Sequence, residues 1–241
     1  MRLALCGLGK AGKAFVKYVI EQKENELICV LCRDESDTAG KPVSEITGIV
    51  TPQELIVERI REFDNQKFNV DVIIDFSASS TTIELLELCC RNRINLVICP
   101  TDFSDKQIEY IKKKVDMSEI GVVYAPTLTR GINILIDFVS KLARYEEYHF
   151  EIIERHAKNK LSPTKTAQCI LREINRDDTN IASVRLDGYV GIHEVSATNG
   201  CERITIVHES FSREAFVKGA LMTADFIKDK KGFYKIKDIQ I

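Results

Sequence analysis

The first 126 residues alternate between short apolar segments and longer amphipathic segments, and this alternation constrains the fold more than any other feature of the chain. The short segments are rich in Val, Ile and Leu, and the longer ones carry apolar residues at helical spacing. Apolar strands separated by helices are typical of parallel strands that helical crossovers bury on both faces. The pattern therefore predicts an α/β fold with a doubly wound parallel sheet. The expected strands are 2–7, 26–32, 70–77, 94–100 and 120–126, and the expected helices are 11–23, 80–92 and 104–115.

After Ala125 the pattern changes, because strands follow one another without intervening helices near the end of the chain. Two consecutive strand segments of this kind favour an antiparallel sheet. One of the predicted helices has clear start signals, with Ser162 as its N-cap and Pro163 at its first position. The expected helices are 131–148, 162–175 and 213–230, and the expected strands lie in 149–156, 182–197 and 202–211.

Length and charge exclude several classes of protein. The 241 residues suffice for one large domain or two smaller ones, and the net charge of −2 argues against nucleic acid or an anionic membrane as the main partner. No apolar run approaches the roughly 18 residues of a membrane-spanning helix. The N-terminus reads as a strand rather than a signal peptide, because glycines interrupt its apolar run. We therefore expect a cytoplasmic protein.

Most of the eight cysteines lie in apolar runs, as reduced core residues of a cytosolic protein do. Cys29 and Cys32 form a C-x-x-C pair, but residues three apart on a strand face opposite sides of the sheet. No second pair of ligands stands at zinc spacing. We therefore expect no metal site.

Gly7, Gly9 and Gly12 form a G-x-G-x-x-G pattern between the first expected strand and the first expected helix. Glycines in this context permit a tight turn and let backbone amides approach a pyrophosphate at a helix N-terminus. Lys10 adds a cation beside the turn. The pattern predicts a Rossmann-type dinucleotide site, and the alternative is a tight turn that binds no ligand.

The end of the second expected strand bears on the choice of cofactor. An acid at this position holds the adenosine ribose and repels a 2′-phosphate. Here Cys32 occupies the acidic position and Arg33 follows it, which favours NADPH over NADH because arginine binds phosphate well. Asp34 lies one residue further and could restore a preference for NADH.

Positive charge is concentrated in residues 154–167, ERHAKNKLSPTKTA, although the whole chain is slightly acidic. A local basic site in such a chain indicates a small anionic ligand. His156, Lys160 and the start of a helix carry this interpretation, and a solvated basic loop is the alternative. We interpret His193 and His208 as hydrogen-bonded sheet residues.

The segment from residue 151 to 167, EIIERHAKNKLSPTKTA, resembles the active-site segment E-x-H-H-x-x-K-x-D-x-P-S-G-T-A of the 4-hydroxy-tetrahydrodipicolinate reductase (dihydrodipicolinate reductase) family. Other segments of this chain resemble further motifs of that family, in the same order and along nearly the whole chain. They are GLGKAG, DVIIDFS, YAPTLTRGIN, RLDGYVGIHEV, ERITIVHESFSREAFVKGALMTADFI and GFYKIKDI.

The resemblance implies an organisation and an activity. A dinucleotide-binding domain is expected from 1–127 and 212–241, and an α+β domain with an open mixed sheet, which binds substrate and mediates assembly into a homotetramer, from 128–211. The implied reaction is NAD(P)H-dependent reduction of 4-hydroxy-tetrahydrodipicolinate, a small dicarboxylate, to tetrahydrodipicolinate in lysine and diaminopimelate biosynthesis.

The resemblance also implies roles for single residues. Lys160 matches the proton donor and His156 the acid/base histidine of the family. The implied substrate contacts are Lys165, Thr166 and Arg213. The implied cofactor contacts are Gly7, Gly9, Lys10, Ala11, Gly12, Arg33, Cys99, Thr101, Ala125, Thr127 and Leu128.

Several positions depart from the family pattern within these motifs. Ala157 replaces the second histidine, Lys165 replaces a glycine, and Pro100 and Asp102 alter a Gly-Thr-Thr-Gly loop. Thr127 replaces an asparagine, and Ile192 a glutamate. Two alternatives therefore stay open: a divergent enzyme that reduces another carboxylated imine or ketone, and a catalytically inactive nucleotide-binding protein.

Overall fold

The computed structural model describes residues 1–239, which divide into two compact units. The first unit contains Met1–Pro126 and the segment that begins at Phe216, and the second contains Thr127–Ala215. The last two residues of the expected dinucleotide-binding domain, 240 and 241, lie outside the described residues. None of the helices described is long and apolar enough to cross a membrane.

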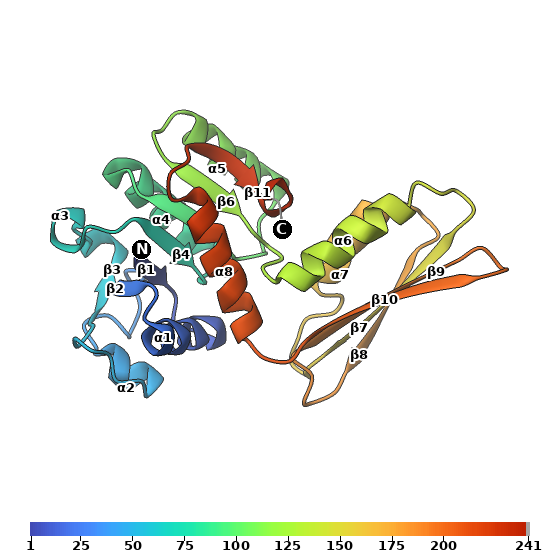
Figure 1. Cartoon of the computed structure of the whole chain (residues 1–241). Helices are drawn as coiled ribbons and strands as arrows, with labels where there is room; N and C mark the ends of the chain where they lie inside the picture. Colours follow the sequence, from blue (N-terminus) through green and yellow to red (C-terminus); the bar gives the residue numbers. More distant parts are fainter. Residues whose placement is uncertain (240–241) are drawn as a thin grey trace. The chain divides into compact units, whose positions relative to one another are not determined.

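The first unit is built on a parallel sheet that has seven strands in the described chain (Figure 1). The strand order is β11-β6-β5-β4-β1-β2-β3, so the direction of winding reverses between β1 and β4. The doubly wound sheet and its five expected strands are confirmed, whereas β3 and β11 were not predicted as strands. The strands are β1 (Arg2–Cys6), β2 (Glu26–Cys32), β3 (Val57–Arg59), β4 (Val72–Asp75), β5 (Asn95–Ile98), β6 (Gly121–Tyr124) and β11 (Gly232–Lys235).

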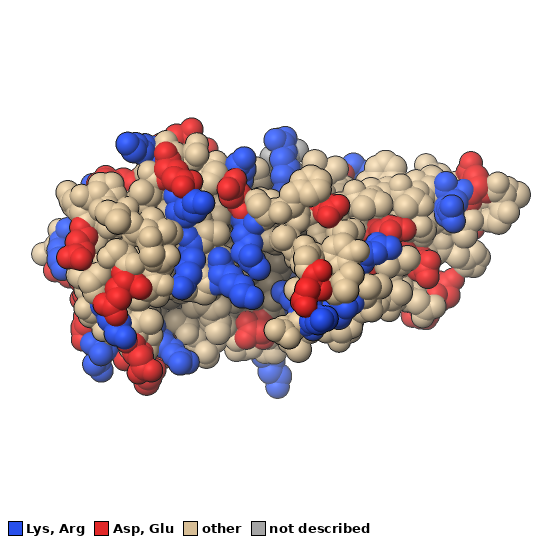
Figure 2. Space-filling model, turned by 90° about the horizontal axis from the view of Figure 1, so that it is seen from below, with Lys and Arg blue, Asp and Glu red and all other residues tan. Residues whose placement is uncertain are grey.

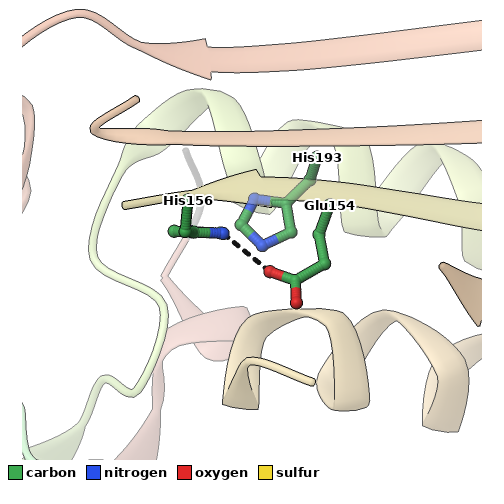
Figure 3. Close-up of side chains that lie close together, drawn as sticks. All are labelled: Glu154, His156 and His193. Atoms are coloured by element: carbon green, nitrogen blue, oxygen red, sulfur yellow. Dashed lines mark ion pairs between the residues drawn. The ribbon is translucent and has the colours of Figure 1, made fainter. Parts of the chain in front are cut away.

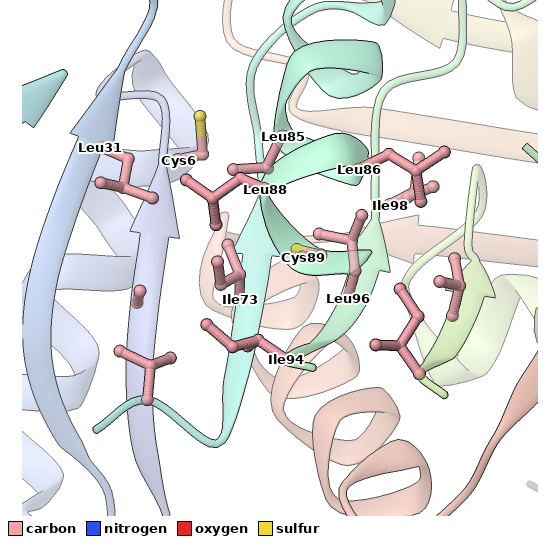
Figure 4. Close-up of a cluster of buried hydrophobic side chains, with 14 of the residues drawn as sticks. Cys6, Leu31, Ile73, Leu85, Leu86, Leu88, Cys89, Ile94, Leu96 and Ile98 are labelled. Carbon is pink, nitrogen blue, oxygen red and sulfur yellow. The ribbon is translucent and has the colours of Figure 1, made fainter. Parts of the chain in front are cut away.

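Helices cover this sheet and complete its core. Figure 4 shows Leu85 and Cys89 of α4 packed with Ile73 of β4 and Leu96 of β5, all of them fully buried. Each fully buried Leu or Ile contributes about 1.5–3 kcal/mol to folding. The helices of this unit are α1 (Lys10–Gln22), α2 (Val43–Thr47), α3 (Asn65–Phe68), α4 (Ser79–Asn92), α5 (Asp105–Asp116) and α8 (Glu214–Ile227), with short 3-10 turns η1 (Ile60–Glu62) and η2 (Ile236–Asp238).

All eight cysteines are free thiols, and most are buried. Burial raises the pKa of the Cys29 thiol to about 12, with a smaller contribution from Glu58. Burial likewise raises the pKa of Cys32. Thiols of this kind are inert core residues, as the sequence analysis expects.

The second unit is a four-stranded mixed sheet with two helices on one face (Figure 1). The order is β10-β9-β7-β8, where β9 is antiparallel to both neighbours and β8 is parallel to β7. Strand β7 alternates exposed and buried residues, so one face of the sheet packs under the helices. The elements are α6 (Arg130–Leu142), β7 (His149–His156), α7 (Lys165–Ile174), β8 (Asn180–Arg185), β9 (Gly191–Thr198) and β10 (Arg203–Ser210).

The antiparallel pairing expected near the end of the chain is confirmed, because β10 pairs with β9 antiparallel. The parallel pairing of β8 with β7 makes the sheet mixed, as the resemblance implies. Two local predictions in this unit are wrong. The helix predicted over 131–148 ends at Leu142, and the Arg176 guanidinium donates hydrogen bonds to the carbonyl groups of Ala143, Tyr145 and Glu146 just beyond that end.

The second wrong prediction concerns the start of α7. Thr164, not Ser162, is the N-cap, because its hydroxyl accepts a hydrogen bond from the Ala167 amide. Pro163 consequently precedes the helix instead of occupying its first position. Lys165 and Thr166 nevertheless lie in the first helical turn, as expected.

Charges of both signs lie side by side across the face shown in Figure 2. Charged residues of the described chain form surface ion pairs, such as Lys158 with Asp187 at 3.2 Å. Each exposed pair contributes little to stability.

Candidate active site

The glycine turn between β1 and α1 has a shape that its sequence requires. Gly7 has a φ of +95°, and a Cβ there would lie 2.9 Å from the backbone of Phe76 and Ser77. A Cβ at Gly12 would lie 2.0 Å from the carbonyl oxygen of Gly7. In contrast, a Cβ at Gly9 would meet no described atom within 4 Å. The fold therefore requires Gly7 and Gly12, while the space beside Gly9 is open to a ligand.

Gly9 is also the N-cap of α1, and it offers no side chain to the free amides of the first turn. The 13-residue helix places a partial positive charge at this end. Lys10 and Ala11 are the first two helical residues, so their amides point out of the helix end. This arrangement suits a phosphate group.

The carboxyl end of β2 holds the residues that bear on cofactor choice. The Arg33 carbonyl accepts a hydrogen bond from the Ser36 amide at 3.1 Å, but the exposed Arg33 side chain has no hydrogen bond or ion pair among the described residues. Asp34 instead accepts a hydrogen bond from the Arg61 amide at 3.3 Å and lies 3.8 Å from the Arg61 guanidinium. The Asp34 carbonyl accepts a further bond from Arg59 at 3.0 Å. The acid is thus drawn toward β3 and η1, and the arginine is free.

A buried carboxylate supports the glycine turn from β4. Asp75 accepts hydrogen bonds from the Ser77 amide at 2.8 Å and from the hydroxyls of Ser77 and Thr82. Burial raises its pKa to about 6, although these hydrogen bonds act in the opposite direction. Asp75 fixes the backbone at Phe76 and Ser77, against which Gly7 packs. Asp75 was not among the site residues expected from the sequence.

The remaining expected cofactor residues lie at the carboxyl ends of β5 and β6 or just beyond. Cys99 and Ala125 are buried, and Thr101 is half-buried, in the first unit. Thr127 and Leu128 are buried at the start of the second unit, where the Thr127 hydroxyl donates a hydrogen bond to Asn133 at 2.8 Å.

In the second unit, a cluster of buried polar residues lies on the helix-covered face of the sheet. Figure 3 shows Glu154 and His156 pointing toward each other with the His193 ring beside them. His156 Nδ1 lies 2.6 Å from Glu154 Oε2. The two imidazole rings are 5.0 Å apart and meet edge to face. His193 Nε2 lies 3.3 Å from the Thr164 hydroxyl, so the cluster reaches the N-terminus of α7.

Glu154 is completely buried, and three donors share its Oε1 atom. Arg185 donates at 2.6 Å, the Ser183 hydroxyl at 2.7 Å and the Thr164 amide at 3.3 Å. Burial acts to raise the pKa of Glu154, but the bonds from Arg185 and Ser183 and the nearby charges outweigh it and hold that pKa below its usual value. Glu154 is therefore an ionised carboxylate at neutral pH.

Arg185 also fixes the loop that carries Lys160. Its guanidinium donates to the carbonyl of Lys160 at 2.9 Å and to that of Leu161 at 2.8 Å. The Lys160 amide in turn donates to the Ala157 carbonyl at 3.0 Å. The Lys160 side chain itself is exposed. One arginine thus ties the lysine loop to the carboxylate beneath the histidines.

Burial lowers the pKa of both histidines in the cluster. Burial lowers the pKa of His193 to about 3, and repulsion from a charged His156 is the second largest cause of this lowering. The pKa of His156 is also lowered, because burial and the cations Lys160 and Arg185 outweigh the attraction of Glu154. Both rings are therefore neutral at pH 7.

Glu154, His156 and His193 offer the donor types of a transition-metal site, and their donor atoms lie within 4.8 Å of one another. The Arg185 guanidinium, however, lies 2.6 Å from the same carboxylate and disfavours a second cation there. His156 Nδ1 lies 2.6 Å from the other oxygen of that carboxylate, which is the distance of a close charge-assisted pair.

The structure brings some expected site residues together and leaves others apart. Lys160 and His156 share one network, and Lys165 and Thr166 follow Thr164 at the start of α7. Arg213 is exposed beside α8, and no contact among the described residues joins it to this cluster.

Sequence reasoning missed Glu154 and Arg185 and treated His193 as a sheet residue only. His193 does make the expected hydrogen bond, but it also packs against His156. The available signal was strand alternation, since residues 154 and 156 of β7 must share one face. His208 makes a bond of the expected kind, 3.3 Å from the Thr129 hydroxyl.

Two departures from the family pattern have structural explanations. Asp102 accepts hydrogen bonds from the amide and hydroxyl of Ser79, so it holds the start of α4. Ile192 precedes His193 on β9 and faces the opposite side of the sheet, away from the histidine cluster.

Comparison with known proteins identifies the family. The model for the N-terminus of dihydrodipicolinate reductase matches residues 1–128, and the model for its C-terminus matches residues 131–239. The chain belongs to the dihydrodipicolinate reductase family. The resemblance of the motifs is thereby confirmed, and with it the expectation of an NAD(P)H-dependent oxidoreductase.

Named relatives extend over nearly the full length of this dihydrodipicolinate reductase family member. The 4-hydroxy-tetrahydrodipicolinate reductase of Blochmanniella floridana is 30% identical over 99% of this chain and 98% of the relative. That of Methanopyrus kandleri is 29% identical over 98% of this chain and 95% of the relative. The dipicolinate-bound dihydrodipicolinate reductase from Paenisporosarcina sp. TG-14 has a TM-score of 0.81 at 24% identity and covers 100% of this chain and 99% of its own. This last likeness shows a shared fold.

Proposed function

We propose that this protein reduces 4-hydroxy-tetrahydrodipicolinate to tetrahydrodipicolinate with NAD(P)H in lysine and diaminopimelate biosynthesis. The observation that carries the proposal is the buried His156–Glu154 pair, tied through Arg185 to the Lys160 loop. It occupies the segment that resembles the family's active site, in a chain whose relatives carry this activity in their names.

The dinucleotide is proposed to bind the first unit over the glycine turn. The open space beside Gly9 and the free amides of Lys10 and Ala11 suit its pyrophosphate. We assign residues 1–127 and 212–241 to this role. The further contacts proposed are Gly7, Gly12, Arg33, Cys99, Thr101, Ala125, Thr127 and Leu128.

NADPH is the proposed preferred cofactor. Arg33 is free to bind a 2′-phosphate, while Asp34, the acid that could favour NADH, is held by Arg61. Steady-state kinetics with both cofactors test this preference. Tenfold better efficiency with NADH would refute it.

The reaction places two demands on the protein. The cofactor supplies a hydride, which adds to a carbon of the substrate's conjugated imine as water is lost. Negative charge then develops on the ring nitrogen or its conjugated carbon. A donor must therefore supply a proton from the side opposite the hydride. We assign that donation to Lys160 and an acid/base role to His156, whose neutral ring can accept a proton.

The two substrate carboxylates require cations and amide donors. Thr164 caps α7 with its own hydroxyl, and the following residues Lys165 and Thr166 present backbone amides at the helix end. Lys165 adds a positive charge where the family motif has a glycine. Arg213 is a further proposed contact. The dipicolinate bound to the related reductase is a dicarboxylate of this class.

We propose assembly into a cytoplasmic homotetramer through the open face of the second unit's sheet, residues 128–211. The helices α6 and α7 cover the other face. On the open face, Val184 and Val207 are 42% and 57% exposed. Exposed apolar side chains on a strand surface suit burial against another copy. Light scattering tests this directly, and a monomeric mass would contradict it.

Two lysines of one loop provide a matched test of the mechanism. Lys160→Ala should reduce turnover at least 100-fold, because general acid catalysis commonly contributes 10²–10⁴-fold. Lys158→Ala removes an exposed lysine paired with Asp187 and should retain turnover. Both variants should bind NADPH as the unmodified protein does. Equal turnover of the two variants would remove the role assigned to Lys160.

A second candidate substrate class is favoured by two substitutions. Ala157 and Lys165 both change the segment that contacts substrate in the family motif. They suit a divergent enzyme that reduces another carboxylated imine or ketone. Competition between that substrate and 4-hydroxy-tetrahydrodipicolinate in one assay separates the two candidates.

A further inference from the structure

Glu154 lies beneath the reacting residues rather than among them, and it accepts hydrogen bonds from the N-cap of α7 and from two residues of β8. We propose that Glu154 is a positioning residue: its carboxylate holds the proton on His156 Nδ1 and leaves Nε2 as the atom that exchanges a proton during the reaction. This inference deepens the proposed function and rests on it for the catalytic consequence.

The first support is that the two oxygens of the Glu154 carboxylate have different partners. Oε1 is occupied by Arg185, Ser183 and the Thr164 amide. Oε2 has no hydrogen-bond partner of its own among the described residues, and neither has His156 Nδ1, yet the two atoms lie 2.6 Å apart. Because both atoms are buried, only a proton held between them satisfies both.

The second support comes from the other side of the imidazole ring. A Cβ at residue 191 would lie 2.9 Å from His156 Nε2 and 3.3 Å from its Cδ2. Gly191 does not have a positive φ, so its backbone conformation does not require glycine. The missing side chain instead leaves room at Nε2. One nitrogen is therefore bound to the carboxylate, and the other is kept clear.

The charges around the ring explain why a carboxylate is needed. Four ionisable groups face His156: Glu154 from β7, Lys160 from the following loop, Arg185 from β8 and His193 from β9. Burial and the two cations disfavour an imidazolium, and Glu154 alone favours it. Without Glu154 the ring would be a weaker base and would have no fixed tautomer.

Nitrogen NMR of the unmodified protein provides the first test. With ¹⁵N-labelled histidine, and with His156→Asn used for assignment, His156 is expected as the Nδ1–H tautomer at neutral pH. An Nε2–H tautomer would overturn the proposal. This measurement needs neither substrate nor a variant of Glu154, so it stands even if Glu154→Gln fails to fold.

The variant Glu154→Gln provides the second test. It removes the negative charge but keeps the shape, and we expect a mixed tautomer at His156 and a fall of at least tenfold in kcat. The limb of the pH–rate profile that belongs to His156 should move to lower pH, because the only favourable charge is gone. The Kd for NADPH should be unchanged. An unaltered pH profile together with an unaltered tautomer would contradict the proposal.

Ser183→Ala is the matched control, because it removes one hydrogen bond from the same carboxylate without altering its charge. It should lower thermal stability but keep the Nδ1–H tautomer and the position of the pH limb. If Ser183→Ala shifts that limb as far as Glu154→Gln does, disturbance of the network alone accounts for the effect and the proposal fails. The expected tautomer in a protein that binds no dinucleotide would support the pairing and overturn only the proposed function.

Discussion

Gly9 and Gly12 belong to one motif, yet the packing of the fold requires only Gly12. A side chain at Gly12 would collide with the backbone oxygen of Gly7 at 2.0 Å, whereas Gly9 has open space within the described chain. The motif in the sequence cannot distinguish a glycine needed for packing from one needed for a ligand. The structure assigns Gly12 to packing, and we propose the ligand role for Gly9.

A pair of alanine substitutions follows from this difference. Gly12→Ala should fold poorly, because no side-chain movement relieves a clash with backbone. Gly9→Ala should keep the stability of the unmodified protein within about 1 kcal/mol but weaken NADPH binding at least tenfold. Thermal melting and fluorescence titration measure the two properties. Normal NADPH affinity in Gly9→Ala would show that no pyrophosphate approaches this turn.

The buried His193 should make the free energy of unfolding of this protein depend on pH. Its pKa is lowered to about 3 in the folded protein, against an ordinary value of about 6.5. Between these values the unfolded chain binds a proton that the folded chain does not, so stability should decrease as pH falls below about 6.5. For one group the loss between pH 7 and pH 5 is at most about 2 kcal/mol.

Urea unfolding at pH 7 and pH 5 checks this dependence. His193→Asn should show a smaller loss of stability between the two pH values than the unmodified protein does. His149→Asn is the control, because His149 is exposed and pairs with Asp178 at the surface. An equal loss in all three proteins would contradict the low pKa of His193.

At the scale of elements, the sequence predicts what depends on local pattern and misses what depends on tertiary contacts. Five of the seven strands described in the first unit follow from apolar runs, and β7 with His156 at its end follows from alternation. The start of α7 does not, because Ser162 and Thr164 are both good caps. Thr164 is the cap, and it also contacts Glu154 through its amide and His193 through its hydroxyl. These are tertiary contacts that the local sequence does not reveal.

The pairing of β8 was unpredictable for the same reason. Nothing in its sequence specifies β7 rather than β9 as neighbour. In the fold, this neighbour brings Ser183 and Arg185 to the carboxylate of Glu154. The polar network beneath His156 is therefore a product of topology, which explains why only its two motif residues, His156 and Lys160, could be named from the sequence.

Arg185 connects β8 to the Lys160 loop, and Arg185→Lys tests that connection. Lysine keeps the positive charge, but its single ammonium group cannot bond at once to the carbonyls of Lys160 and Leu161 and to the Glu154 carboxylate, as the guanidinium does. We expect a loss of about 1–3 kcal/mol in stability and faster amide exchange in residues 157–163. Arg155→Lys, which alters a single pair with Glu194 on the other face, should cost about 1 kcal/mol or less. Equal effects of the two changes would contradict the special position of Arg185.

At the scale of the whole molecule, each unit supplies one half of the proposed chemistry. The first has a glycine turn shaped for a dinucleotide, and the second has a basic segment over a buried histidine–carboxylate pair. The family match extends across both units. Because the proposed reaction uses both halves, we expect activity only from the complete chain.

Oxidation of NADPH by the unmodified protein tests this account most directly. The unstable substrate is generated in the cuvette from pyruvate and aspartate semialdehyde by the preceding condensing enzyme, and absorbance at about 340 nm is followed. We expect rapid loss of absorbance that depends on both the condensing enzyme and this protein. No loss with either NADPH or NADH, while the substrate is demonstrably formed, would contradict it.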